Sequence, residues 1–190
     1  MANNVYEIKE SSIADPGPLG LACFALTTFV LSVKNAALVP GEALSMIIAC
    51  ALFYGGTAQI LAGMWEFKKN NVFGATAFTS YGAFWVSWGF FEIGALLKWF
   101  VVPPQAALLF LIAWTIFTFY MWIGSFGTNK ALVVVFTLLL VTFILLDLGN
   151  HVAAGYCGIV TALAAWYTSA AGIYNTVFGR VVLPVGPCKK

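Results

Sequence analysis

Charged residues along the chain separate six long apolar segments. They cover residues 19–38, 43–65, 72–97, 105–124, 131–149 and 153–178. Each is near or above the ~20 residues that a helix needs to cross a bilayer. The connections carry turn or charged residues, clearest at Pro40-Gly41, Pro103-Pro104, EFKKNN and GTNK, and least clear around GNHVAAG. The pattern therefore predicts a bundle of six transmembrane helices.

Composition supports an all-α integral membrane protein. Of the 190 residues, 62% are hydrophobic and only 8% are charged, whereas a soluble domain has roughly a quarter charged residues. We expect one transmembrane domain over residues 1–190, in which 1–18 are a polar tail and helix start and 179–190 are a second tail. The four cysteines show no CxxC pairing, so we expect no metal and no cofactor. A net charge of +2 gives no sign of a nucleic-acid partner.

The basic residues predict the orientation of the bundle. With six spans both termini lie on one side, and seven basic residues fall on that side: Lys9, Lys68, Lys69, Lys130, Arg180, Lys189 and Lys190. Only Lys34 and Lys98 fall on the other side. The positive-inside rule therefore places both termini in the cytoplasm and the protein in the cytoplasmic membrane. The polar N-terminal stretch lacks the basic start and apolar core of a signal peptide.

The stretch DPGPLG, residues 15–20, precedes the first apolar segment. Asp15 suits a helix N-cap, and Pro16 and Pro18 are tolerated in a first turn because their missing N–H groups would lack a partner there. Gly17 and Gly20 leave room for a neighbouring helix or a solute. The motif is either a rigid helix start or an anion-binding helix terminus.

Small residues recur at a spacing of four in the last segment. One row is Ala154, Gly158 and Ala162, and the other is Thr161, Ala165 and Ser169. In lipid such rows let two helix backbones approach closely. They predict tight packing, either within one subunit or between subunits.

Several motifs resemble those of a known family. DPGPLGLACF is similar to the signature that opens the acetate uptake transporters, the succinate–acetate permease family of the GPR1/FUN34/YaaH type. FYGGTAQILAGMWEFKKNNVFGATAFTSYGAFW (53–85), LLDLGN (145–150) and FGRVVLPVG (178–186) also fit. The resemblance implies a six-helix subunit with its own pore, assembled into a hexamer. It further implies transport of acetate and related small carboxylates, either coupled to protons or channel-like.

The resemblance also implies an apolar ring at the narrowest point of the pore. Aligned on the motifs, this ring falls on Phe24, Tyr81 and Leu139. The chain departs from the family at Asp15, where Asn is usual. A carboxylate there would repel an anion at the inner mouth unless backbone N–H groups cap it or a basic residue pairs with it.

Neutral hydrogen-bond donors within the apolar segments are candidates for binding a carboxylate that has shed its water. They are Thr27, Thr28, Gln59, Thr79, Ser80 and Asn150, with the Tyr81 hydroxyl in addition. Any single Thr or Ser in a spanning helix more often bonds its own backbone.

Ionisable residues on the outer half form a second candidate group. Lys34 could attract an anion into an outer vestibule, and Glu92 or Asp147 could accept a coupling proton. Alternatively these residues form interfacial pairs, such as Lys34 with Asp147. His151, the one histidine of the sequence, is either a pH sensor or an exposed loop residue.

Three rival functions were weighed against carboxylate transport. An intramembrane serine protease built on GSFG would need Ser125 beside His151, which the predicted topology places at opposite membrane faces. An enzyme is therefore excluded. A channel for urea or a short amide remains the main alternative, and a structural or receptor-like role would be revealed by the absence of solute flux.

Overall fold

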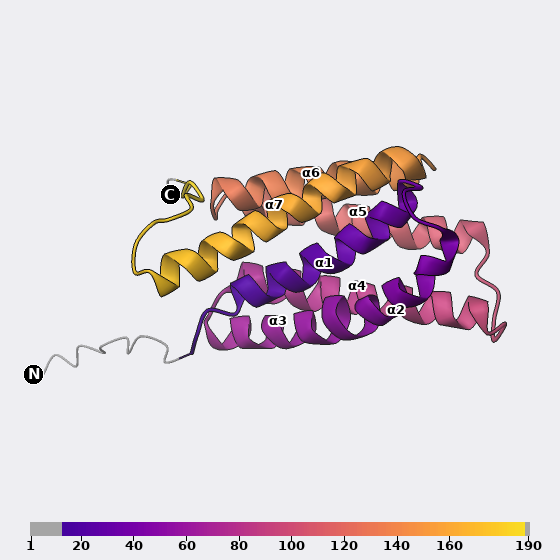
Figure 1. Ribbon diagram of the computed structural model, residues 1–190, viewed down its shortest axis with the longest axis horizontal. Helices are drawn as coiled ribbons and strands as arrows, with labels where there is room; N and C mark the ends of the chain where they lie inside the picture. The colour runs from indigo at the N-terminus through magenta and orange to yellow at the C-terminus, as the bar shows by residue number, and fades with distance from the viewer. Residues whose placement is uncertain (1–12, 189–190) are drawn as a thin grey trace, which may run out of the picture.

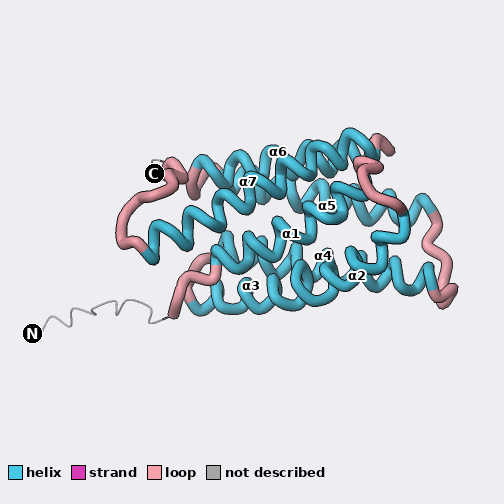
Figure 2. Tube along the Cα trace, in the orientation of Figure 1, coloured by secondary structure: helices cyan, strands magenta, loops and turns pink. Residues whose placement is uncertain are grey.

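The computed structural model describes residues 13–188, and its regular structure is helical. The elements are α1 (Gly17–Asn35), η1 (Gly41–Ala43), α2 (Leu44–Leu52), η2 (Phe53–Ala58), α3 (Gln59–Lys68), α4 (Val72–Leu96), α5 (Pro104–Ser125), α6 (Lys130–Asp147) and α7 (His151–Val177). The long helices run side by side along the bundle (Figures 1 and 2). The predicted all-α class is confirmed, and the helix bounds lie within three residues of the predicted segments.

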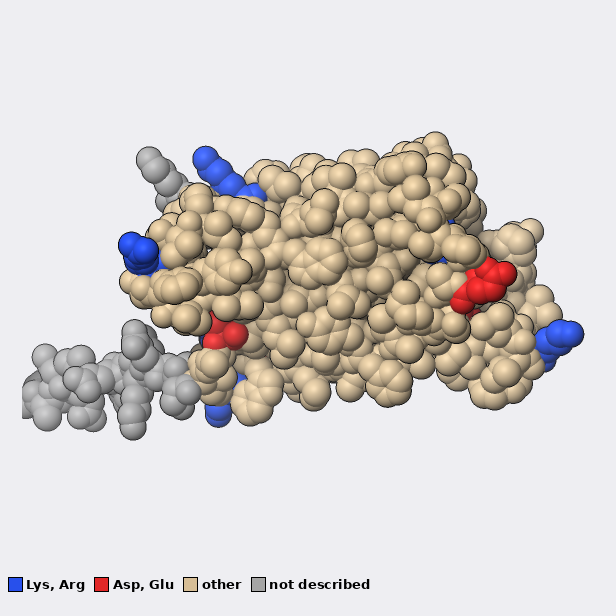
Figure 3. All heavy atoms as spheres, in the orientation of Figure 1, with Lys and Arg blue, Asp and Glu red and all other residues tan. Residues whose placement is uncertain are grey.

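Within the described residues, five helical segments are long and apolar enough to cross a membrane. They are Gly17–Asn35, Gly41–Lys68, Pro104–Ser125, Lys130–Asp147 and His151–Val177. Helix α4 is 25 residues long and has ten buried residues, but Gly, Ser, Thr and Tyr dilute its apolar character. Acidic and basic groups on the face shown in Figure 3 gather toward the two ends and leave an uncharged middle. The chain is a multi-pass membrane protein, and six spans stay a prediction.

The described chain begins and ends at the same end of the bundle, which we call the terminal end (Figure 1). The start of α1, the α3–α4 and α5–α6 junctions and the end of α7 lie there, and the other junctions lie at the far end. By this helix order the terminal end carries Lys68, Lys69, Lys130 and Arg180, and the far end carries Lys34 and Lys98. Lys9, Lys189 and Lys190 lie outside the described residues.

The boundary between α6 and α7, which the sequence left least clear, is a sharp turn. Gly149 has φ +73°, a left-handed conformation that glycine adopts without steric cost. The Asn150 N–H donates to the Leu145 carbonyl at 2.9 Å, and the Gly149 N–H donates to the Leu146 carbonyl at 2.9 Å. This is the pattern of a Schellman cap, which ends α6 at that point.

A π-helical segment, η2, interrupts the second apolar segment and was not predicted. Its Gly55 packs against the side chain of Thr27 on α1, where a Cβ would collide with the hydroxyl. The Thr57 hydroxyl donates to the Leu52 carbonyl at 2.8 Å, which satisfies a backbone acceptor in the irregular turn. Single π turns inside helices are frequent at functional sites. Here the π turn ends immediately before Gln59.

The small-residue rows of α7 are packed against elements of the same chain. Gly155 and Gly158 contact Ser32 of α1 so closely that an added Cβ would clash. Ser169 donates a hydrogen bond to the Pro18 carbonyl at 2.6 Å. Tight packing of α7 therefore occurs within the chain, against Pro18 near the start of α1 and Ser32 near its end.

Gly20 lies where α1 meets α4, and we predict that a larger side chain there destabilises the bundle. A Cβ at Gly20 would lie 2.7 Å from three ring atoms of Phe78, so the buried ring would have to shift from its place in the core. Overpacking of this kind costs about 1–3 kcal/mol. Gly20→Val should therefore lower the melting temperature of the detergent-solubilised protein. Gly41→Val is the control, because a Cβ at Gly41 meets nothing within 4 Å; equal melting temperatures for the two variants would contradict the assignment.

A C-terminal strap, residues 182–188, folds back over the terminal end. The Asn175 side chain donates to the Leu183 carbonyl at 2.8 Å and accepts from the N–H groups of Val182 at 2.7 Å and Leu183 at 3.0 Å. The N–H groups of Lys130 and Ala131 donate to strap carbonyls at 2.7 and 3.0 Å. The strap thus supplies acceptors for the first two N–H groups of α6, which have no partner within the helix, and the Asn129 side chain accepts the Leu132 N–H at 2.9 Å.

Candidate functional site

A cavity of about 420 Å³ opens at the terminal end and reaches into the bundle. Since one water occupies ≈ 30 Å³ in the liquid, the cavity has room for on the order of ten waters. Polar residues of its wall include Asp15, Glu66, Lys69, Asn129 and Asn175. Its apolar wall comes from α1, α4 and α6, with contributions from Leu21, Phe24, Phe78, Tyr81, Leu132, Val135, Phe136 and Leu139. The cavity therefore passes from a polar mouth to an apolar interior.

The three residues assigned to the apolar ring come together on this cavity. Phe24, Tyr81 and Leu139 belong to three different helices, all three line the cavity, and each is at most 6% exposed. The rings of Phe24 and Tyr81 lie 5.8 Å apart. The Tyr81 hydroxyl is 2.9 Å from the Thr118 hydroxyl of α5, so this hydrogen bond fixes the ring orientation.

Sequence reasoning missed Phe136, which joins the same group. Its ring lies 6.2 Å from that of Tyr81 and 5.2 Å from that of Phe73, and it lines the cavity. A spacing of three from Leu139 places both residues on one face of α6. This periodic signal was present in the sequence but is shared by every packed helix.

Gln59 is the predicted polar candidate that lines the cavity. Its side chain is 1% exposed, and neither the amide nitrogen nor the amide oxygen has a hydrogen-bond partner. Buried polar atoms are nearly always paired, because an unpaired one costs about 1–3 kcal/mol. The Gln59 amide, with two N–H donors and one acceptor, is therefore a buried polar group without a protein partner beside the cavity.

The predicted Thr, Ser and Asn donors are not part of the cavity lining. Thr27 donates to the Cys23 carbonyl at 3.0 Å, and Thr28 is buried without a partner. Thr79 packs against Gly63 of α3, and the neighbouring Ser80 is half-buried. Asn150 is exposed and caps α7 by accepting from the Ala153 N–H at 3.2 Å. Of the predicted donors, the structure therefore brings Gln59 and Tyr81 to the cavity, and the Tyr81 hydroxyl is already hydrogen-bonded to Thr118.

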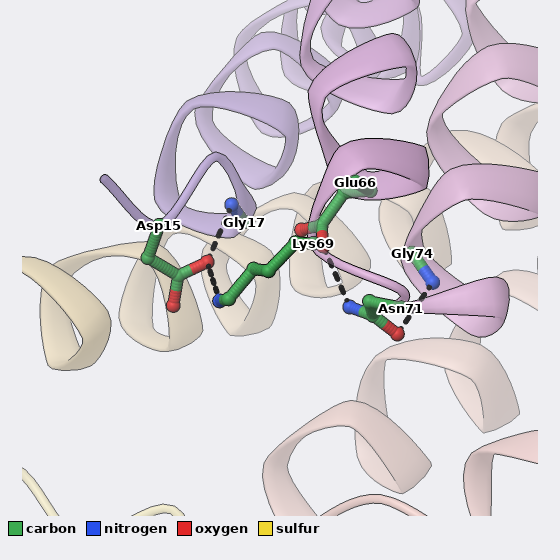
Figure 4. Close-up of polar contacts among 6 residues, drawn as sticks. All are labelled: Asp15, Gly17, Glu66, Lys69, Asn71 and Gly74. Atoms are coloured by element: carbon green, nitrogen blue, oxygen red, sulfur yellow. Dashed lines mark hydrogen bonds and ion pairs between the residues drawn. The ribbon is translucent and has the colours of Figure 1, made fainter. Parts of the chain in front are cut away.

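The mouth of the cavity contains an ion pair. Helix α1 begins at Gly17, so Asp15 lies one residue before its N-cap, Pro16. One carboxylate oxygen of Asp15 accepts the Gly17 N–H at 3.0 Å and lies 2.7 Å from the Lys69 ammonium (Figure 4). Asp15 is thus both capped by a backbone N–H and paired with a basic residue, the two conditions that would offset its repulsion of an anion.

A hydrogen-bond network that joins Glu66, Asn71 and Gly74 lies beside this ion pair. Asn71 donates from its amide nitrogen to Glu66 at 2.8 Å and accepts the Gly74 N–H at 3.1 Å, which caps α4 (Figure 4). Glu66 is 1% exposed and lines the cavity. In the sequence, the charged stretch EFKKNN indicates only a loop. The spacing of seven between Gln59 and Glu66, two helical turns, could have placed both on one face.

The predicted outer group lies at the far end and does not line this cavity. The alternative ion pair of Lys34 with Asp147 does not form among the described residues: Asp147 accepts a hydrogen bond from the Thr115 hydroxyl at 2.6 Å. Glu92 interacts electrostatically with Lys34. Asp147 and Glu92 have different partners because α5 places the Thr115 hydroxyl beside Asp147. His151 is exposed at the first position of α7.

The residues weighed for a serine protease are far apart. Ser125 ends α5 at the terminal end, where its hydroxyl donates to the Trp122 carbonyl at 2.6 Å. His151 begins α7 at the far end. The 18 residues of α6 run between the two ends, a length of about 27 Å. No nucleophile–base contact can form between Ser125 and His151.

Comparison with known proteins gives the same family as the sequence motifs. The GPR1/FUN34/yaaH family matches residues 1–189. The chain is 38% identical over 192 residues to the succinate-acetate/proton symporter SatP of Escherichia coli K12, covering 93% of this chain and 97% of SatP. It is also 38% identical to the ammonia transport outward protein 2 of Saccharomyces cerevisiae, over 84% of this chain. The chain spans 61% of the length of its yeast relatives.

A solved structure, that of the bacterial acetate channel SatP, has the same architecture. The two chains superpose with a TM-score of 0.87 at 38% sequence identity, over 92% of this chain and 99% of the other. Sequence motifs, family match and fold agree over nearly the whole length. The chain belongs to the GPR1/FUN34/YaaH family of membrane proteins.

Proposed function

We propose that the protein transports acetate and related small carboxylates across the cytoplasmic membrane through the cavity and the apolar ring. In this proposal the terminal end faces the cytoplasm, six helices span the bilayer and the subunits form a hexamer. SatP, a relative that covers almost the whole chain, is named as a succinate-acetate/proton symporter and as an acetate channel. The basic residues at the terminal end support the orientation.

The observation that carries the proposal is the position of Gln59 relative to the ring. An acetate ion has a carboxylate that needs hydrogen-bond donors and a methyl group that needs an apolar surface. The free Gln59 amide supplies the donors, and Phe24, Tyr81 and Leu139 supply the apolar surface on the same cavity. A neutral donor binds the anion weakly enough for release, which a conduction pathway requires.

A second candidate, passage of a small neutral solute such as urea or a short amide, is favoured by one feature. The cavity wall carries two carboxylates, Asp15 and Glu66, and one ammonium, Lys69. The mouth is therefore not positively charged and would not concentrate anions by itself. The unpaired Gln59 amide would serve an amide solute equally well.

Labelled acetate flux into proteoliposomes tests the proposal. We expect acetate to enter with a saturable rate that unlabelled succinate lowers and that urea leaves unchanged. Inhibition by urea, with urea itself transported, would establish the second candidate, and no flux of either solute would contradict both.

The same liposomes test whether acetate uptake is coupled to the proton gradient. Uptake above the acetate equilibrium that collapses with the proton gradient means a proton-coupled carrier. Glu66, the buried carboxylate on the cavity wall, would then be replaced first, ahead of Glu92 and Asp147. Flux that only follows the acetate gradient means a channel.

A further inference from the structure

The mouth of the cavity carries one ammonium and two carboxylates. Among the described residues that line the cavity, Lys69 is the one basic side chain. Gly17 separates the acids: a Cβ built there would lie 3.1 Å from an Asp15 oxygen and 3.4 Å from a Glu66 oxygen. Glu66 interacts electrostatically with both Asp15 and Lys69. Any carboxylate that crosses this mouth meets Lys69 as its attractive charge.

The geometry lets a passing anion exchange with Asp15. The side chains of Lys69 and Asp15 are 33% and 46% exposed. Ion pairs that are exposed to solvent in this way are weak and dissociate easily. Asp15 cannot follow Lys69 far, because the same oxygen accepts the Gly17 N–H at 3.0 Å. The Lys69 ammonium, which pairs with Asp15 in Figure 4, ends a flexible four-carbon side chain, so it can turn from Asp15 to a substrate in the cavity.

We propose that Lys69 is a second substrate contact, at the cavity mouth, and that Asp15 is a built-in competitor for it. A small carboxylate binds the Lys69 ammonium by displacing Asp15, and Asp15 takes the ammonium back when the substrate leaves. The competition keeps the affinity of the mouth low and speeds release there. This inference rests on the proposed carboxylate transport and adds the residue pair that sets substrate affinity on one side of the membrane.

The variant Asp15→Asn separates two roles of Asp15, its negative charge toward Lys69 and its hydrogen bond with the Gly17 N–H. Its amide oxygen still accepts the Gly17 N–H, while the competing charge is lost. The half-saturating acetate concentration measured from the cytoplasmic side should fall about two- to fivefold, the range expected for removing one exposed ion-pair competitor. The value from the external side should not change.

Lys69→Gln should raise the half-saturating acetate concentration measured from the cytoplasmic side. In the double variant, adding Asp15→Asn to Lys69→Gln should leave that concentration unchanged. At about 1 M salt, where the Debye length is about 3 Å, the effect of Asp15→Asn should largely disappear.

The measurement compares initial rates of labelled acetate uptake by intact cells with those by inside-out vesicles from the same cells, each corrected for cells without the protein. Lys68→Gln is the matched control, because Lys68 is exposed and is not part of the cavity lining. Gel filtration of each variant checks assembly, and Lys69→Gln alone tests the inference if Asp15→Asn does not assemble.

An equal shift from both sides, or an Asp15→Asn effect that persists without Lys69, would overturn the inference. If wild-type protein carries no acetate, the proposed function fails and the inference falls with it. Wild-type flux with no shift in the variants contradicts the inference alone.

Discussion

Gln59→Leu is expected to make the protein more stable and, at the same time, a much poorer transporter. Leucine fills a similar volume without the two buried amide atoms that lack partners, so the variant should gain about 1–2 kcal/mol in the free energy of unfolding. Hydrogen bonds to a charged group are worth about 1.5–3 kcal/mol, and their loss should slow acetate flux about tenfold or more. Thermal melting in detergent and labelled acetate flux in liposomes measure the two effects.

A gain in stability together with a loss of acetate flux distinguishes a substrate-binding role of Gln59 from a merely structural one. A packing residue would lose stability and flux together, so a lower melting temperature would contradict the assignment of Gln59. Gln105→Leu is the matched control, because Gln105 is exposed at the start of α5 and is not part of the cavity lining. It should change neither melting nor flux.

Leu139→Ala is expected to change which carboxylates pass. Leu139 is 5% exposed and lines the cavity with Phe24 and Tyr81, so its truncation widens the ring instead of opening a sealed void. The larger succinate should gain most, and the ratio of succinate to acetate flux should rise about tenfold, equivalent to about 1.4 kcal/mol in the barrier. Paired isotope flux in one liposome preparation measures this ratio directly.

The neighbouring leucine provides the control for this substitution. Leu140 is half-buried and is not part of the cavity lining, so Leu140→Ala removes the same atoms on another face of α6. Its flux ratio should stay at the wild-type value. A larger shift for Leu140→Ala than for Leu139→Ala would show that the ring assignment is displaced by one residue.

Helix positions were predictable from sequence because uncharged runs and turn residues both follow from the cost of burying polar groups in lipid. The break at Gly149 shows the limit of this signal: Asp147, Asn150 and His151 indicate a boundary only loosely, and the positive φ of Gly149 decides where α6 ends. The π turn at η2 could not be predicted, since it arises from the close packing of Gly55 on Thr27, a contact between helices.

Residues of the candidate site were predictable where one helix determines their position. Gln59 was found because a long polar amide in an apolar segment is unusual. The pairing of Asp15 with Lys69 was foreseen only as a condition, because it joins the start of α1 to the α3–α4 junction. A pair of Lys34 with Asp147 was one alternative suggested by their similar depth, but the Thr115 hydroxyl of α5 donates a hydrogen bond to Asp147 instead. The depth of a residue in the membrane follows from the helix topology. Its side-chain partners depend in addition on how each helix is rotated about its own axis.

The central claim, that Gln59 holds the carboxylate beside the ring, can be measured as a distance. The sequence has two glutamines, Gln59 and Gln105, so side-chain ¹⁵N labelling of glutamine gives two amide signals in solid-state NMR of the protein in bilayers. With carboxyl-¹³C acetate, we predict a dipolar coupling to the Gln59 amide that corresponds to about 4 Å, the separation set by one hydrogen bond. No coupling to Gln59 in a sample that transports acetate would contradict the claim.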